Sequence, residues 1–121
     1  MDTFVFIGKN MKIGIDIEEV KRFSKLIKNK AFLKRVFSKE EIDYCKSKKQ
    51  SAQHFAVRFA AKEAVWKAVN HKKNVVITDI FIKNEDSGKP QVFIKNRKAP
   101  YIDVSLSHTG DIVVAVAVSS K

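Results

Sequence analysis

The order of apolar and polar positions predicts a strand followed by two short helical segments. Apolar residues alternate with small or polar ones over residues 12–17, which is the period of a strand. From about residue 20 to residue 28 the apolar positions recur at helical spacing instead, so a helix is expected there. An apolar patch over residues 32–37 indicates a second segment that is short and either helical or irregular.

Two more helices are expected in the middle of the chain. Ser38 is followed three residues later by Glu41, the spacing of a capping box, so a short helix should begin there and reach about Ser47. Residues 46–51 are a polar connector, and the longest helix is predicted over residues 51–70.

Strand patterns dominate the second half of the chain. Polar turns, one of them containing Gly88 and another containing Gly110, separate these patterns. Four strands are expected, at residues 75–83, 90–95, 103–107 and 112–119. A run of helices followed by a run of strands predicts an α+β fold, with helices packed on an antiparallel sheet.

Composition adds that this is one domain with an anionic partner. A chain of 121 residues is below the size at which chains usually divide. Its 24 Lys and Arg against 13 Asp and Glu give a net charge of +11, which favours nucleic acid, a membrane, an acidic protein or a polyphosphate ligand without choosing among them. Cys45 is the only cysteine, so no internal disulfide can form, and a cytoplasmic location is expected. No apolar run is long enough to cross a membrane.

Two acidic residues stand out because they lie in apolar surroundings. Asp16 is flanked by isoleucines in the first strand, and Glu63 lies within the longest helix. A buried carboxylate must be paired or bind a metal, and Mg²⁺ takes one or two protein carboxylates together with water and phosphate oxygens. A cation site that handles a polyanion is therefore one interpretation. For Asp16, capping of the following helix is an equally good interpretation.

The faces of the longest helix suggest roles for its charged residues. Phe55, Phe59 and Trp66 form one stripe, which is expected to be core. Glu63 lies at the edge of this stripe, and Lys67, four residues later, is its neighbour, so the two can form either an ordinary surface ion pair or a functional pair.

Arg58 and Lys62 project from the opposite side of that stripe. A solvated basic edge explains them at least as well as a binding role. A lone histidine such as His108, at a strand end before a turn, is more often structural than catalytic.

Four motifs in order resemble one family. Residues 14–22 read GIDIEEVKR, similar to the family pattern Gly-x-Asp-Ile-x-Glu-Ile-x-Arg. Residues 58–68 read RFAAKEAVWKA, similar to its Arg-Phe-Ala-x-Lys-Glu-Ala-x-x-Lys-Ala helix, and GKP at 88–90 and VSLSH at 104–108 follow. The chain resembles holo-[acyl-carrier-protein] synthase, the short bacterial 4'-phosphopantetheinyl transferase. The resemblance covers residues 11–118, so residues 1–10 are expected to be an extension and 11–121 one transferase domain.

The resemblance implies a reaction and a set of roles. A serine hydroxyl of apo acyl carrier protein attacks the pyrophosphate of coenzyme A, phosphopantetheine is transferred, adenosine 3',5'-bisphosphate leaves, and fatty acid biosynthesis is supported. It implies Mg²⁺ on Asp16 and Glu63, with Lys67 as a further catalytic residue and either Glu63 or a metal-bound water accepting the serine proton. The residues it implies for coenzyme A binding are Arg58, Lys62, Lys67 and His108.

The same resemblance implies two protein contacts. A basic cluster on and after the first helix becomes the dock for the acidic carrier: Lys21, Arg22, Lys25, Lys28, Lys34 and Arg35. Residues 112–118 are apolar on both faces of a strand, so a subunit contact is expected there, and the resemblance implies a homotrimer with coenzyme A between neighbouring subunits.

The chain departs from the family after the long helix, where residues 70–73 read NHKK instead of the common Gly-Thr-Gly. No nucleic-acid or membrane partner is expected. The alternatives from other functional classes are a small basic nucleic-acid-binding module and a basic adaptor for an acidic protein.

Overall fold

The computed structural model describes residues 10–70 and 74–121. Strand β1 (Lys12–Glu19) leads into three short helices, α2 (Val20–Leu26), α3 (Lys30–Val36) and α4 (Lys39–Lys46), and then the long helix α5 (Ser51–Val69). After a 3-10 turn at Ile77–Asp79 come the strands β2 (Ile80–Asn84), β3 (Pro90–Ile94), β4 (Arg97–Lys98), β5 (Ile102–Thr109) and β6 (Ile112–Ser119). The predicted α+β class, with helices on antiparallel strands, is confirmed.

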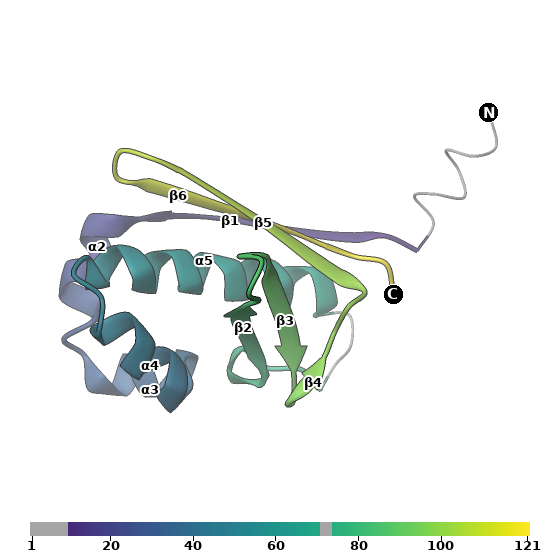
Figure 1. The fold of residues 1–121 in the computed structure, drawn as a ribbon, viewed down its shortest axis with the longest axis horizontal. Coiled ribbons are helices and arrows are strands. Elements are labelled where there is room, and N and C mark those ends of the chain that lie inside the picture. Colours follow the sequence, from purple (N-terminus) through teal and green to yellow (C-terminus); the bar gives the residue numbers. More distant parts are fainter. Residues whose placement is uncertain (1–9, 71–73) are drawn as a thin grey trace.

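The strands form two antiparallel sheets rather than one. The larger has the order β1-β6-β5 and the smaller β2-β3-β4. Figure 1 shows α5 running between them, with the long strands on one side and the small sheet, α3 and α4 on the other. Helix α5 therefore joins both sheets, and the buried core forms around its apolar residues.

Gly14 allows β1 to lie directly against α5. A Cβ atom at this position would sit 1.8 Å from the carbonyl oxygen of Ala64, which is backbone and cannot rotate away. This close approach fixes the depth at which the next residues of β1 face the helix. On that face of the sheet, Val113, Ala115 and Ala117 of β6 are also buried against α5.

On β1 and β6, the opposite face of the large sheet is apolar and open in the single chain. Ile13, Ile15 and Ile17 expose 67%, 58% and 63% of their surface, which is unusual for isoleucine. They pair in register with residues 118, 116 and 114 of β6, all valines and all half-buried. The outer face of β1 and β6 is thus one continuous aliphatic patch, whereas β5 contributes polar residues to this face.

The structure confirms one predicted helix start and shifts one predicted strand start. The capping box is confirmed: Glu41 N donates to Ser38 Oγ at 3.1 Å and Ser38 N donates to a Glu41 carboxylate oxygen at 3.0 Å. The strand predicted to start at residue 75 starts at Ile80, because Asp79 accepts a hydrogen bond from Val76 N at 3.0 Å and holds a turn there. Strand β4 was not predicted.

The aromatic stripe on α5 contributes to the core as predicted. Phe55 is fully buried, and Phe59 keeps 9% of its surface exposed. Trp66 is half-buried and donates its indole N–H to Val75 O at 3.1 Å.

Candidate active site

Asp16 lies inside β1 and faces α5, so it does not cap the following helix. Its side chain is 10% exposed. Lys67 Nζ is 3.3 Å from Asp16 Oδ1 and donates to the carbonyl of Ile15 at 3.0 Å. In the described residues, the other carboxylate oxygen of Asp16 is buried without a hydrogen-bond donor. The expected strand-embedded carboxylate is therefore confirmed, and one of its oxygens is available for a ligand.

Glu63 of α5 belongs to the same cluster. Burial, and next the negative charge of Asp16, raise the pKa of Glu63, while Lys67 acts in the opposite direction. The ion pair that Lys67 forms is with Asp16 on a different element, so an isolated surface pair of Glu63 and Lys67 is the wrong description. The structure brings together all three residues predicted to be catalytic.

Glu18 is a third acidic member that the sequence reasoning missed. It lies two residues beyond Asp16 on the same face of β1, only 8% exposed, and accepts a hydrogen bond from Arg22 at 2.7 Å. Burial, followed by the neighbouring Asp16 carboxylate, raises the pKa of Glu18 to about 8, while the charge of Arg22 acts in the opposite direction. The two-residue spacing was the available signal, but the strand predicted from the sequence ends at residue 17, before Glu18.

The acidic cluster of Asp16, Glu18 and Glu63 has the chemical character of a binding site for a divalent cation. The charge of Asp16 raises the pKa of both Glu18 and Glu63, and one buried carboxylate oxygen of Asp16 is left without a donor. Within residues 10–70 and 74–121, no three His, Cys, Asp or Glu side chains are placed to hold a metal by themselves. A cation here would therefore need oxygens from water or from a substrate as well, which is how Mg²⁺ is usually bound.

His108 lies on the same sheet face as the acidic cluster. Pairing places Glu18 beside Val113 and Val113 beside His108, so the three residues form one row across the sheet. Two strand spacings separate Glu18 from His108, about 10 Å. The imidazole is exposed and can meet a ligand that reaches across this face.

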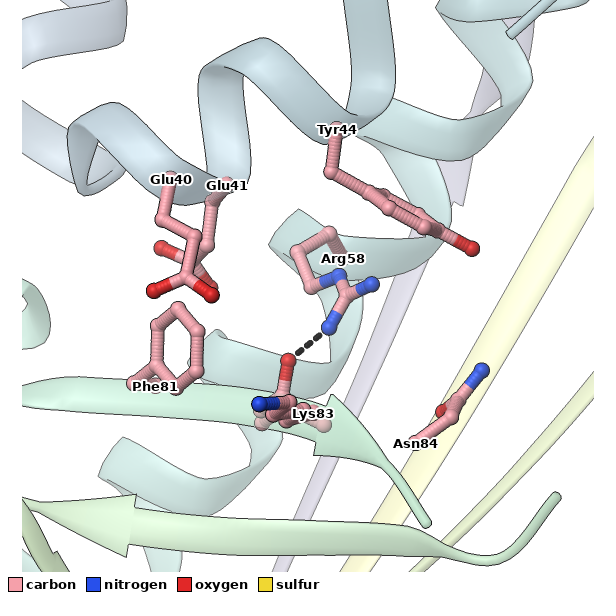
Figure 2. Close-up of a pocket in the computed structure, with 8 residues that line it drawn as sticks. Glu40, Glu41, Tyr44, Arg58, Phe81, Lys83 and Asn84 are labelled. Carbon is pink, nitrogen blue, oxygen red and sulfur yellow. Dashed lines mark hydrogen bonds between the residues drawn. The ribbon is translucent and has the colours of Figure 1, made fainter. Parts of the chain in front are cut away.

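Arg58 lines a cavity of about 180 Å³ between α4, α5 and β2. It donates to the carbonyl of Ile82, and its guanidinium lies 5.2 Å from the ring centre of Tyr44. Figure 2 shows Arg58 between Tyr44 and the β2 backbone, with Phe81 and Asn84 on either side. The cavity thus has two aromatic residues suited to a flat ring, and it mixes the cations Arg58 and Lys83 with the acids Glu40 and Glu41.

Lys62 lies elsewhere, and the expected solvated basic edge is wrong for it. Its side chain is 0% exposed, and Nζ is 2.7 Å from Glu41 Oε1 on α4. Burial lowers the pKa of Lys62, and Glu41 acts against that shift. The ammonium has no solvent-facing side from which to bind coenzyme A, so its role in the described structure is to tie α4 to α5.

The basic residues expected to dock a carrier are all exposed on or after α2: Lys21, Arg22, Lys25, Lys28, Lys34 and Arg35. Arg22 keeps 55% of its side chain exposed even while it pairs with Glu18. The departure at residues 70–73 cannot be placed, because residues 71–73, like residues 1–9, lie outside the described parts of the chain.

Known proteins resemble this chain over most of its length. Residues 12–117 match the family model of the 4'-phosphopantetheinyl transferase superfamily. A holo-[acyl-carrier-protein] synthase of Geotalea daltonii is 38% identical over 120 residues, covering 89% of this chain and 96% of the relative. One from a Geobacillus species is 42% identical over 114 residues, covering 90% and 95%.

Solved structures of the same family share the fold. The holo-[acyl-carrier-protein] synthase of Neisseria meningitidis superposes with a TM-score of 0.74 at 29% identity, over 91% of this chain and 98% of that one. The enzyme of Bacillus anthracis, solved in complex with coenzyme A (3',5'-ADP), gives 0.74 at 33% identity, over 89% and 94%. The chain therefore belongs to the 4'-phosphopantetheinyl transferase superfamily, and within it to the holo-[acyl-carrier-protein] synthases.

Proposed function

We propose that the protein transfers 4'-phosphopantetheine from coenzyme A to a serine of apo acyl carrier protein. The observation that carries this proposal is the meeting of Asp16, Glu63 and Lys67 on the β1–α5 contact, within a family whose members carry the synthase name. Further parts of the proposal are the release of adenosine 3',5'-bisphosphate, a cytoplasmic location, and support of fatty acid biosynthesis. Residues 11–121 act as the transferase domain, and residues 1–10 are an extension.

Asp16 and Glu63 would hold a Mg²⁺ ion, with Glu18 beside them. The orphan oxygen of Asp16 and the mutual repulsion of the acids support this assignment. When bound, Mg²⁺ neutralises charge on the pyrophosphate and on the leaving group. Lys67 is 44% exposed, so its ammonium can donate to a phosphate oxygen while it stays beside Asp16.

The chemical step balances as a displacement at phosphorus. The serine oxygen bonds to the phosphorus that carries pantetheine, and the bond from that phosphorus to the bridging pyrophosphate oxygen breaks. The electron pair leaves with adenosine 3',5'-bisphosphate. The serine proton passes either to Glu63, whose pKa is raised by burial and by the charge of Asp16, or to a water beside it.

Arg58 and His108 would bind different parts of coenzyme A, because the two residues lie at different places relative to the acidic cluster. Arg58 precedes Glu63 by five residues on α5, so it lies about 7.5 Å along the helix axis, beside the cavity with aromatic walls. We assign the nucleotide end of coenzyme A to that side. His108, in one row with Glu18, would contact the pyrophosphate side.

The exposed basic cluster on and after α2 would receive the acidic carrier. Its residues are Lys21, Arg22, Lys25, Lys28 and Arg35. Such surfaces steer association, and their attraction for an acidic partner weakens with salt.

Within the part of the chain that is described, no helix has the length and apolar character needed to cross a bilayer.

The aliphatic outer face of β1 and β6 supports a homotrimer as the working unit. Ile13, Ile15 and Ile17 would be covered by neighbouring subunits, with coenzyme A in the clefts between them. Sedimentation equilibrium at micromolar concentration should report about three chains per particle. A fully active monomer would contradict this part of the proposal.

The reaction itself is tested by mass. The full chain is incubated with coenzyme A, Mg²⁺ and apo carrier protein, and the carrier is expected to gain one phosphopantetheine group, with no gain in chelator. A nucleic-acid module or an adaptor without chemistry leaves the carrier's mass unchanged, and that outcome would overturn the proposed function.

A further inference from the structure

One residue of the carrier dock, the exposed basic cluster on and after α2, is held differently from the others. Arg22 donates to a Glu18 carboxylate oxygen at 2.7 Å, and Glu18 is 8% exposed. Lys21 meets Glu19 only at 4.0 Å, and both of these side chains are largely exposed. Among the described residues, three further members of the dock have no acidic partner within 4.0 Å: Lys25, Lys28 and Arg35.

The acid that holds Arg22 is itself fixed in place. Pairing of β1 with β6 sets Glu18 in register with Val113, which is 1% exposed. Helix α2, which carries Arg22, is anchored where it begins, because Lys21 N donates to Asp111 Oδ1 at 3.0 Å. The carboxylate and the helix therefore keep one relation to each other, and the hydrogen bond between them restricts the arginine side chain.

Burial decides how Glu18 can act on a partner. A carrier cannot reach a side chain that is almost fully buried, whereas Arg22 keeps 55% of its side chain exposed. Arginine presents several N–H donors in a planar fork, so one donor can stay on Glu18 while others meet an acid of the carrier. The family pattern leaves the position of Glu18 open, so that pattern does not account for a buried acid there.

We propose that Glu18 is a positioning residue that holds Arg22 ready for the acidic carrier. The inference rests on the proposed function, because it takes the carrier as the partner of this surface. An arginine that is already held loses less conformational freedom on binding than a free one does. The charge of Glu18 acts the other way, since it weakens the attraction of the dock for an acidic partner. The test must therefore separate the hydrogen bond from the charge.

Two substitutions of Glu18 make that separation. Glu18→Gln removes the charge and keeps a carbonyl that accepts from Arg22, whereas Glu18→Met has a similar length and lacks the carbonyl. Binding of fluorescently labelled apo carrier protein to the full chain is measured by anisotropy, in chelator and without coenzyme A, so that neither a cation nor the transfer contributes. Glu18→Met should bind the carrier about threefold more weakly than Glu18→Gln, the size of effect expected from ordering one long side chain.

The same comparison is then made in the Arg22→Ala background. There Glu18→Met and Glu18→Gln should bind alike, to within about 1.5-fold, because no guanidinium remains to be positioned. Asp43 is the matched control, since it pairs with Lys39 four residues away at 2.8 Å, but both side chains are exposed and lie outside the dock. Asp43→Met and Asp43→Asn should bind the carrier equally well.

Two results would overturn the inference while leaving the proposed function intact. One is equal binding by Glu18→Gln and Glu18→Met, and the other is a threefold difference that persists with Arg22→Ala. Thermal unfolding checks that each variant is folded, and Glu18→Leu replaces Glu18→Met if the latter does not unfold cooperatively. If the unmodified protein neither binds the carrier nor adds to its mass, the proposed function fails and the inference fails with it.

Discussion

Two adjacent residues of α5 meet opposite environments. Lys62 is fully buried and its charge is answered by Glu41 at 2.7 Å. Glu63, the next residue, is half-buried and faces Asp16, a group of the same sign. Helix α5 therefore carries a buried ion pair on one side, and on the other it contributes to an acidic cluster in which three carboxylates face only two cations, Lys67 and Arg22.

The difference separates stability from function. Breaking a buried ion pair destabilises a protein because the remaining charge has no water around it. Lys62 and Glu41 therefore hold α4 in place, even though one Glu41 oxygen lacks a donor. Repulsion among the acids of the cluster raises the free energy of the metal-free fold, and a cation bound as we propose would relieve it. Strain of this kind is expected where a protein binds a ligand.

The largest expected effect is on activity at the acidic cluster. Asp16→Asn and Glu63→Gln each remove an anionic ligand while almost preserving volume, so transfer to the carrier should fall by more than about a hundredfold. Because each change also relieves repulsion, the free energy of unfolding without metal should stay equal or rise. Carrier mass gain and urea unfolding in chelator measure the two quantities.

Glu40→Gln is the matched control for these two variants. Glu40 is an exposed acid on α4, and its substitution should leave transfer unchanged. Chelator should stop the unmodified protein and added Mg²⁺ should restore it. Full activity of both cluster variants, or of the protein in chelator, would rule out the two-carboxylate mechanism.

The opposite behaviour is expected at the sealed pair. Lys62→Met leaves the Glu41 carboxylate buried alone and should lower the free energy of unfolding by about 3–5 kcal/mol, measured by urea denaturation. The double variant Lys62→Met/Glu41→Leu removes both charges and should recover most of that loss. If the double variant is no more stable than Lys62→Met, the buried ion pair is not the source of the effect.

The active-site acids were predictable because local sequence marks them. Asp16 stands between isoleucines, and Glu63 and Lys67 lie one helical turn apart, so strand and helix periodicity and the family motifs all indicate them. Their meeting depends on Gly14, whose missing side chain lets β1 reach α5.

Other features could not be predicted from local sequence, because they depend on contacts between distant elements or on very short segments. A helical wheel for α5 places Lys62 away from the aromatic stripe but cannot show that Glu41 of α4 covers it. Glu18 lies beyond the strand predicted over residues 12–17, whereas the observed strand extends through Glu19 and so includes it. Strand β4 has only two residues, too few for a periodic pattern.

The pH dependence of the metal-free fold gives a third test. The pKa of the Glu18 carboxyl is about 8 in the folded protein, whereas in the unfolded chain it returns to its ordinary value of 4.5. The folded state then binds more protons in between, so the free energy of unfolding falls as pH rises from about 4.5 to 8. Glu18→Gln should remove at least about 1.4 kcal/mol of that fall, the equivalent of one pKa unit.

Urea unfolding in chelator at pH 5, 6.5 and 8 measures this slope. Glu19→Gln, at the exposed neighbouring position of β1, is the control and should keep the slope of the unmodified protein. If Glu18→Gln keeps that slope too, Glu18 does not share the raised proton affinity of the cluster.

The smallest expected effect is at Arg22, which links the acidic cluster to the carrier dock through its 2.7 Å contact with Glu18. Arg22→Glu reverses an exposed charge, and a charge of this kind contributes about 1 kcal/mol, so the KM for the carrier should rise about fivefold. The KM for coenzyme A should change much less, since the dock does not contact it, and added salt should shrink the difference between variant and unmodified protein. Arg97→Glu makes the same change at an exposed position of β4 and should leave both constants unaltered. Equal increases for both substrates would instead mean that Arg22 acts through Glu18 on the acidic cluster, and the carrier dock would have to lie elsewhere.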